Sequence, residues 1–275
     1  MKIRSFFTSL SVAITLGIST LCISTQAMSD ISLTYQSVKT PEHRSTILVS
    51  EDFIRFENPM APDFFMLFDV KQQYMTLVDS EKNSYSVLDR ETLESLSEQI
   101  EVTRKAIMAE LKASMKVAND EEKEQMAEIL EQIQLLAQAP QQEMIEYRRL
   151  GDETEISGYP CQMIDALVNG ESQAKLCVAN SNDVGVPDSA MHTLESFHNF
   201  SSSVHQQLNP GDTTELLFVM NSKNQLPVSI QRTYPASAVD EYRLVQVQTL
   251  TIPKSAFKVP MAYEEKDIED AFIVE

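Results

Sequence analysis

Hydrophobic and polar residues alternate along the first part of the chain, from Ile31 to Leu88. An alternation with a period of two is typical of strands that bury one face. The apolar stretches are short, and turn-forming Pro, Asp, Asn, Lys and Ser residues separate them. We therefore expect about six strands joined as an antiparallel meander. One stretch, 64–68, is apolar on consecutive residues, which predicts a sheet covered on both faces, or one whose second face lines a cavity.

From Asp89 the apolar spacing changes to three, four and seven residues, which is typical of amphipathic helices. Asp89 is suited to be the N-cap of the first helix. Asn119 and Glu122 have the spacing of a capping box, which would start a second helix. Pro140 would end that helix. The pattern predicts an αα-hairpin over residues 90–139, inserted into a β domain.

The last third of the chain combines one more helix with further strands. A helix is expected to start at Pro187-Asp188 and to end at 209–211, where the sequence is Asn-Pro-Gly. Strands are expected at 215–220, 228–234 and 242–252, followed by an acidic tail. Because proline has no backbone N–H, Pro227 predicts a strand start or a sheet edge. With no internal repeat or low-complexity linker, residues 28–275 are expected to form one α+β domain.

The dipeptide Asn169-Gly170 is a strong β-hairpin signal, because both residues tolerate the positive φ of a primed turn. Cys161 and Cys177 each lie about eight residues from this turn, so the hairpin would bring them roughly opposite each other. We expect a disulfide between them, since neither a Cys-x-x-Cys motif nor a nearby His suggests a metal or catalytic pair.

Residues 1–27 have the pattern of a secretory signal peptide. Lys2 and Arg4 precede an apolar run from Phe6 to Ile23, and Ala27 provides a small residue at the cleavage point. A retained membrane anchor is the alternative, although many Ser and Thr residues interrupt the run. Cleavage would remove Cys22 and leave one even pair, as expected for a periplasmic protein with a disulfide.

Charge, hydrophobicity and missing motifs argue against several classes of function. The net charge of −19 repels nucleic acid and anionic lipid head groups. Outside the signal region no apolar run is long enough to span a bilayer, so an integral membrane protein is not expected. Neither a phosphate-binding loop, a nucleophile elbow nor a zinc-protease motif occurs. His192, His198 and His205 are spaced by six and seven residues, unlike a helical metal pair. We expect a non-enzymatic protein without cofactor or metal.

Several short passages together resemble a family of exported bacterial proteins, domain-of-unknown-function family 4412, which looks related to the LolA/LolB lipoprotein carriers. The matching passages are 53–56 with Pro59, 68–70 before 74–78, 82–85, the helical insert with Met126, 156–161, and 252–260. The resemblance implies a half-barrel, meaning a large curved antiparallel sheet with helices against its open face. It also places Arg55 where the carriers have an arginine that helps to hold the lid. An ordinary exposed ion pair is the alternative role.

Two functions remain open from the sequence. In the first, the curved sheet holds a lipid or other hydrophobic ligand. Its candidate lining residues are aromatic and aliphatic strand residues: Phe53, Phe64, Phe65, Met66, Phe68, Leu217 and Val219. A packed core without a cavity is the alternative for these side chains. In the second function, the hairpin 90–139 docks an envelope protein or a second copy, and the β domain is its scaffold.

Overall fold

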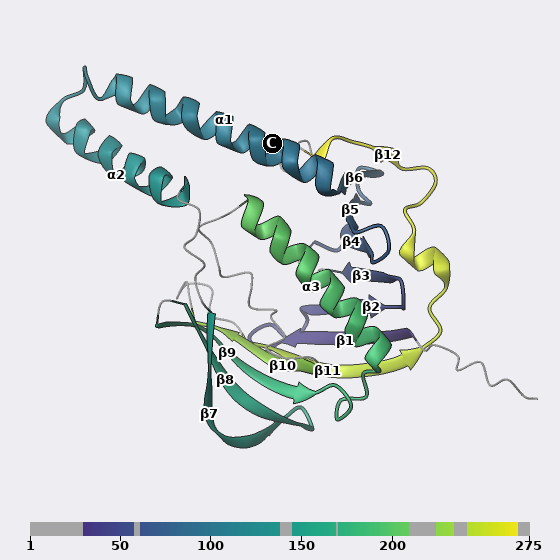
Figure 1. Cartoon of the computed structure of the whole chain (residues 1–275). Coiled ribbons are helices and arrows are strands. Elements are labelled where there is room, and N and C mark those ends of the chain that lie inside the picture. The colour runs from purple at the N-terminus through teal and green to yellow at the C-terminus, as the bar shows by residue number, and fades with distance from the viewer. Residues whose placement is uncertain are drawn as a thin grey trace, which may run out of the picture.

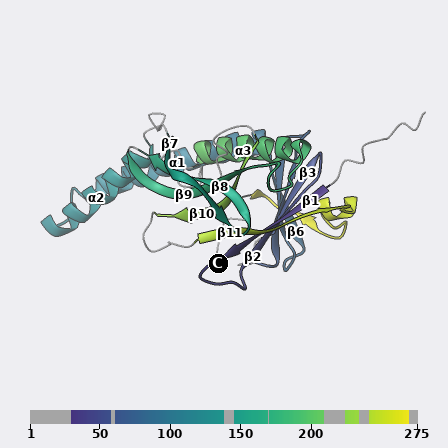
Figure 2. The same ribbon diagram turned by 90° about the horizontal axis from the view of Figure 1, so that it is seen from below.

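The computed structural model describes residues 30–57, 61–137, 145–168, 170–208, 224–233 and 241–268. Within these ranges, twelve strands form one sheet in the order β12-β6-β5-β4-β3-β2-β1-β11-β10-β9-β8-β7. All neighbouring strands are antiparallel except β12, which pairs with β6 in parallel. Three long helices lie on one side of this sheet (Figures 1 and 2). The predicted α+β class with a large curved, mainly antiparallel sheet is confirmed.

The first six strands form the predicted meander. They are β1 (Asp30–Ser37), β2 (Arg44–Val49), β3 (Phe53–Glu57), β4 (Phe64–Asp69), β5 (Tyr74–Asp79) and β6 (Ser84–Leu88). The turn after β4 is built locally, because the Asp69 carboxylate accepts hydrogen bonds from the backbone N–H groups of Lys71 and Gln72. The Asp79 carboxylate likewise accepts from the Lys82 N–H after β5. Such side chain–backbone bonds favour turns over continued strands.

The second meander carries the disulfide. Its strands are β7 (Ile145–Ile156), β8 (Tyr159–Val168), β9 (Glu171–Asn180), β10 (Gln225–Arg232) and β11 (Glu241–Leu250). Val168 pairs with Glu171, and Gly170 before Glu171 has a positive φ of 83°, as a two-residue hairpin turn requires. The disulfide joins Cys161 and Cys177, with their Cα atoms 5.4 Å apart. The predicted hairpin and crosslink are confirmed, although Cys177 pairs in register with Met163, so that the crosslink runs diagonally between the strands.

The two meanders become one sheet through β1 and β11, whose register pairs Asp30 with Leu250. The far edge strand, β7, is interrupted between Arg149 and Glu153 by a bulge. Gly151, at a positive φ of 80°, lies in this bulge. Bulges of this kind protect an edge strand from pairing with other chains.

The helices begin where their capping residues predict. Asp89 caps α1 (Arg90–Ser114) by accepting a hydrogen bond from the Thr92 N–H at 2.9 Å. Before α2 (Asp120–Ala137), Asn119 and Glu122 exchange backbone-to-side-chain hydrogen bonds of 3.0 Å each, which confirms the capping box. The third helix, α3, spans Asp188–Leu208. Within the described residues, no helix is both long and apolar enough to span a membrane.

The main core lies between α3 and the middle of the sheet. Ile31, Leu33 and Val228 contribute from the strands, and Met191 and Leu194 contribute from α3. Both cysteines belong to this cluster and are almost completely buried. The disulfide therefore stabilises the part of the sheet on which α3 rests.

Pro227 lies near the start of β10, as the third residue of the strand. It pairs with Val178 of β9, whereas the pairing of β10 with β11 begins at Ser229. The pairing register of β10 shifts between Pro227 and Ser229, so a bulge accommodates the missing N–H. The Pro227 carbonyl accepts a hydrogen bond from the buried Tyr35 hydroxyl at 2.8 Å. The predicted signal peptide and the predicted strand at 215–220 lie outside the described residues.

Candidate functional site

The candidate ligand-lining residues divide between the two faces of the sheet, because successive side chains of a strand point to opposite faces. Phe64, Met66 and Phe68 of β4 lie on the face covered by the helices. Phe65 lies on the opposite face. Phe53 and Arg55 of β3 share that opposite face, since Ile54 between them packs in the core under α3. The structure thus brings together two small groups of these residues. Leu217 and Val219 lie outside the described residues.

The part of the opposite face that β3–β6 form is covered by the segment 253–268, which we call the C-terminal strap. It contains the short helix η3 (Lys254–Phe257) and β12 (Glu264–Glu265). The Phe257 ring stacks on Phe53 with 5.9 Å between ring centres. Val259 and Tyr263 pack against the cluster that contains Phe65. Figure 1 shows the strap in yellow, running beside the first meander and ending near β6 and the start of α1.

Arg55 holds the strap against the sheet. Its guanidinium donates a hydrogen bond of 3.0 Å to the Ala256 carbonyl and forms a 2.8 Å ion pair with Glu57. It also lies 3.7 Å from the centre of the Phe65 ring, within range of a cation–π interaction. These contacts are to the strap and the outer face, and not to a helical lid.

On the helix-covered face, the apolar residues of β4 meet two helices. Phe68 is buried, and its ring contacts Phe197 and Phe200 of α3 at 5.5 Å and 5.2 Å between ring centres. Phe64 and Met66 are only partly buried. They belong to what we call the α1–α3 cluster, whose partly buried members are Phe64, Met66, Leu96, Phe197, Phe200 and Val204. Buried Met75, Leu77, Leu88, Leu93 and Ile268 lie beneath them.

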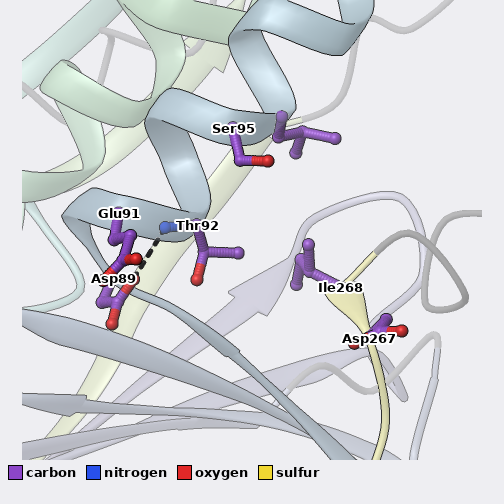
Figure 3. A pocket seen from close by; sticks show the side chains of 7 residues that line it. Asp89, Glu91, Thr92, Ser95, Asp267 and Ile268 are labelled. Atoms are coloured by element: carbon purple, nitrogen blue, oxygen red, sulfur yellow. Dashed lines mark hydrogen bonds between the residues drawn. The ribbon is translucent and has the colours of Figure 1, made fainter.

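A pocket of about 300 Å³ lies at the base of α1, where the strap ends (Figure 3). Leu96 and Ile268, which also belong to the α1–α3 cluster, are its apolar lining. The remaining lining residues are polar: Asp89, Glu91, Thr92, Ser95 and Asp267. The Asp89 carboxylate is the N-cap of α1 and accepts a hydrogen bond from the Thr92 N–H. This hydrogen bond keeps the pKa of Asp89 below the ordinary value. This pocket is therefore polar and acidic.

The hairpin formed by α1 and α2 extends beyond the sheet (Figures 1 and 2). Within α1, all of which is described, only Leu93 is buried. The contacts of α2 are mainly with α1. Large apolar side chains are exposed along the hairpin: Val102, Ile107, Val117 and Ile129. Val117, between the two helices, is 89% exposed. Beyond the base of α1, the described part of the hairpin does not pack on the sheet core.

Two of the three histidines of α3 have described side chains, His192 and His198. Within the described residues, no three His, Cys, Asp or Glu side chains are placed to hold a metal ion. His192 is exposed, and the burial of His198 lowers the pKa of its imidazole. The side chain of His205 lies outside the described residues.

Sequence reasoning missed the strap. Phe257, Val259 and Tyr263 are its apolar anchors, and their order in the sequence carries no strand or helix period. The available signal was the closely spaced pair Pro253 and Pro260, which marks an extended segment, together with the apolar residues between them.

A family model described as "Domain of unknown function (DUF4412)" matches residues 93–263, which is more than half of the chain. The chain belongs to the DUF4412 family. The match includes the hairpin, the disulfide-linked strands, α3 and most of the strap. No curated protein matches this DUF4412 chain significantly.

Solved structures show only distant likeness to the DUF4412 chain. PNGF-II is similar with a TM-score of 0.38 and 9% identity, over 88% of this chain and 32% of that one. MucB in complex with MucA(peri) gives a TM-score of 0.26 and 10% identity, over 86% of this chain and 55% of that one. The chain thus spans about a third to just over half of these proteins. These TM-scores are too low to transfer a function.

Proposed function

We propose that this protein is a non-enzymatic periplasmic module that binds an envelope protein through the α1–α2 hairpin. One observation carries the proposal: the hairpin extends away from a sheet that has its own core, and α2 packs mainly on α1. Apart from Leu93 and Leu96 at the base of α1, no described residue of the hairpin belongs to a core cluster, so the rest of the hairpin is available for a partner. Its exposed apolar side chains would become buried on binding.

The proposed compartment follows from the cysteines and the amino-terminal sequence. Disulfides persist in oxidising compartments such as the periplasm, and Cys161 and Cys177 form one here. Residues 1–27 have the sequence pattern of an export signal. Together they support an exported protein.

The charge of α2 suggests the chemistry of the partner. The helix carries six acidic residues and one basic residue, in a chain of net charge −19. A partner with a basic surface would be attracted, and its association rate would fall as salt increases. We therefore propose a basic protein surface as the counterpart of α2.

The test is a chain with a shortened hairpin. Residues 105–129 are replaced by a short Gly/Ser linker, which leaves Leu93 and Leu96 in place at the base of α1. A second variant keeps the hairpin and removes three of the six negative charges of α2, with Glu121→Gln, Glu124→Gln and Glu128→Gln. We expect the shortened chain to fold and to lose the proteins that the wild type captures after cross-linking in intact cells. The chain with the less acidic α2 should capture them less well. Unchanged capture by the shortened chain would refute the proposal.

A second function, the binding of a hydrophobic ligand, is supported by a separate observation. The six partly buried apolar side chains of the α1–α3 cluster come from β4, α1 and α3 and pack against the same buried core. An acyl chain could lie along them and replace their contact with water. The Phe64 and Met66 side chains would contact such a ligand.

Neighbouring residues of β4 provide the matched variants for this second proposal. Phe64→Ser removes a ring from the α1–α3 cluster, and Phe65→Ser removes one from the opposite face. Organic extracts of gently purified protein are analysed by mass spectrometry. We expect lipid with the wild type and Phe65→Ser, and less with Phe64→Ser. Wild-type protein that reproducibly lacks lipid would argue against a carrier.

A further inference from the structure

The strap crosses from one face of the sheet to the other. Its first part, with Phe257, Val259 and Tyr263, covers the outer face. Its end belongs to the opposite face, because Ile268 packs in the cluster with Leu93 of α1. The strap therefore passes around the β6 edge of the sheet.

At the β6 edge the strap is held by backbone pairing. Glu264 and Glu265 pair in parallel with Ser84 and Tyr85. The Lys266 N–H donates to the Tyr85 carbonyl at 2.8 Å. The Ser86 hydroxyl donates to the Asp267 carbonyl at 3.3 Å. These bonds place the next residue, Ile268, under the first turns of α1.

Ile268 packs in the same cluster as Leu93, the most deeply buried residue of α1. Leu93 is 3% exposed and Ile268 is 6% exposed, and both lie in the same cluster. Leu96, one turn further, lines the pocket with Ile268 and is partly buried. The base of α1 is thus held between Ile268 on one side and α3 on the other.

The length of α1 amplifies any movement at this base. The helix has 25 residues, so it is about 37 Å long at 1.5 Å per residue. A tilt of about 10° at its base would displace its far end by about 6 Å, by the same rise per residue. A small displacement of α1 at Ile268 would therefore produce a much larger displacement at Val117.

We propose that the C-terminal strap is a conformational control on the hairpin: seated under α1, Ile268 fixes the direction of the hairpin, and its release lets the hairpin swing. The inference deepens the proposed function, since it names what regulates the binding arm. Ile268 is a positioning residue in this scheme and contacts no partner itself. The strap has the features of a releasable element, with one short helix and a two-residue strand.

The experiment measures the direction of the hairpin without any partner. Spin labels are attached at Val117→Cys, in the connection that follows the far end of α1, and at Gln72→Cys, in the exposed turn after β4. Double electron–electron resonance then gives the distribution of distances between them. The test variant is Ile268→Ser, and the control is Met261→Ser, at a fully exposed position of the same strap.

We expect one narrow distribution for the doubly labelled wild-type chain and for Met261→Ser. For Ile268→Ser we expect a broader distribution with its mean shifted by several ångströms, while thermal unfolding of the sheet remains cooperative. Should Ile268→Ser not fold, Ile268→Val removes one methylene and should broaden the distribution in the same direction. An unchanged distribution in a folded Ile268 variant would overturn the inference. Because no partner is present, that result would leave the binding role of the hairpin standing.

Discussion

Arg55 connects three chemically different groups at one point of the outer face. Its guanidinium reaches the Glu57 carboxylate, the Ala256 carbonyl and the Phe65 ring. A lysine could not make these contacts together, because it lacks the planar fork of the guanidinium. The residue therefore fixes η3 to β3, and its role belongs to the strap.

Replacing Arg55 tests that role. We expect Arg55→Ala to lower the free energy of unfolding by about 1–2 kcal/mol, since it removes a cation–π contact and a charge-assisted hydrogen bond. Arg55→Lys should recover only part of the loss. Urea unfolding measures both values. Arg149→Ala, at an exposed position of β7, is the control and should have little effect. Equal stability of Arg55→Ala and wild type would show that the strap is held without Arg55.

The cap of α1 makes stability depend on pH. The Asp89 carboxylate accepts the Thr92 N–H, and this bond lowers its pKa. A carboxyl with a lowered folded-state pKa stabilises the fold above its unfolded pKa and loses that contribution as the pH falls through the folded value.

The matched variant is Asp89→Asn, which keeps a capping oxygen without the charge. We expect wild type to be more stable than Asp89→Asn at neutral pH, because the carboxylate also interacts with the helix dipole. The difference should shrink below about pH 4, where an ordinary Asp is protonated. Urea unfolding across the pH range measures it. A difference that does not vary with pH would contradict this assignment.

The local signals of the sequence determined most of the elements. The alternation of apolar and polar residues predicted the first six strands, and the dipeptide Asn169-Gly170 predicted the hairpin that carries the disulfide. The Asn119 and Glu122 pair gave the start of α2. The strap could not be found in this way, because its two paired residues join β6 from about 180 positions away, as the Tyr85–Glu265 hydrogen bond records. Non-local pairing has no sequence period.

The disulfide makes a direct prediction at the level of the hairpin. Cys161 and Cys177 are separated by 16 positions, and a closed loop of that size stabilises a fold by about 3 kcal/mol in the chain-entropy model. We expect the double variant Cys161→Ala, Cys177→Ala to lose a comparable amount in urea unfolding. Wild type treated with reductant under native conditions should keep its disulfide for longer than an exposed disulfide would, since both cysteines are buried. Unchanged stability of the double variant would contradict the role given to the crosslink.

The capping box makes a different prediction, because α2 packs mainly on α1. We expect Asn119→Ala to cost about 1 kcal/mol of local helix stability. Amide hydrogen exchange should therefore accelerate in α2, while the midpoint of thermal unfolding of the sheet changes little. Glu128→Ala, in the middle of α2, is the control. Faster exchange throughout the sheet would mean that the hairpin and the sheet unfold as one unit.

At the scale of the whole molecule, the first meander is covered on both faces, by helices on one face and by the strap on the other. The consecutive apolar residues of β4 predicted a sheet covered on both faces, but they did not indicate which of these side chains lie on the face that the helices cover. Arg55 is an example. The sequence placed Arg55 in a strand, but which face of the sheet its side chain lies on depends on how β3 packs in the complete sheet. The long pairing of β1 with β11 likewise joins the two ends of the domain.

The most direct test of the central claim is site-specific photo-cross-linking in intact cells. A photoreactive amino acid is placed at Val102 or Val117 of the hairpin and, as controls, at the exposed Val38 and Met261. We expect the hairpin positions to give one defined adduct with an envelope protein, which the control positions do not give. Adducts that are absent from the hairpin, or equally abundant at Val38 and Met261, would contradict it.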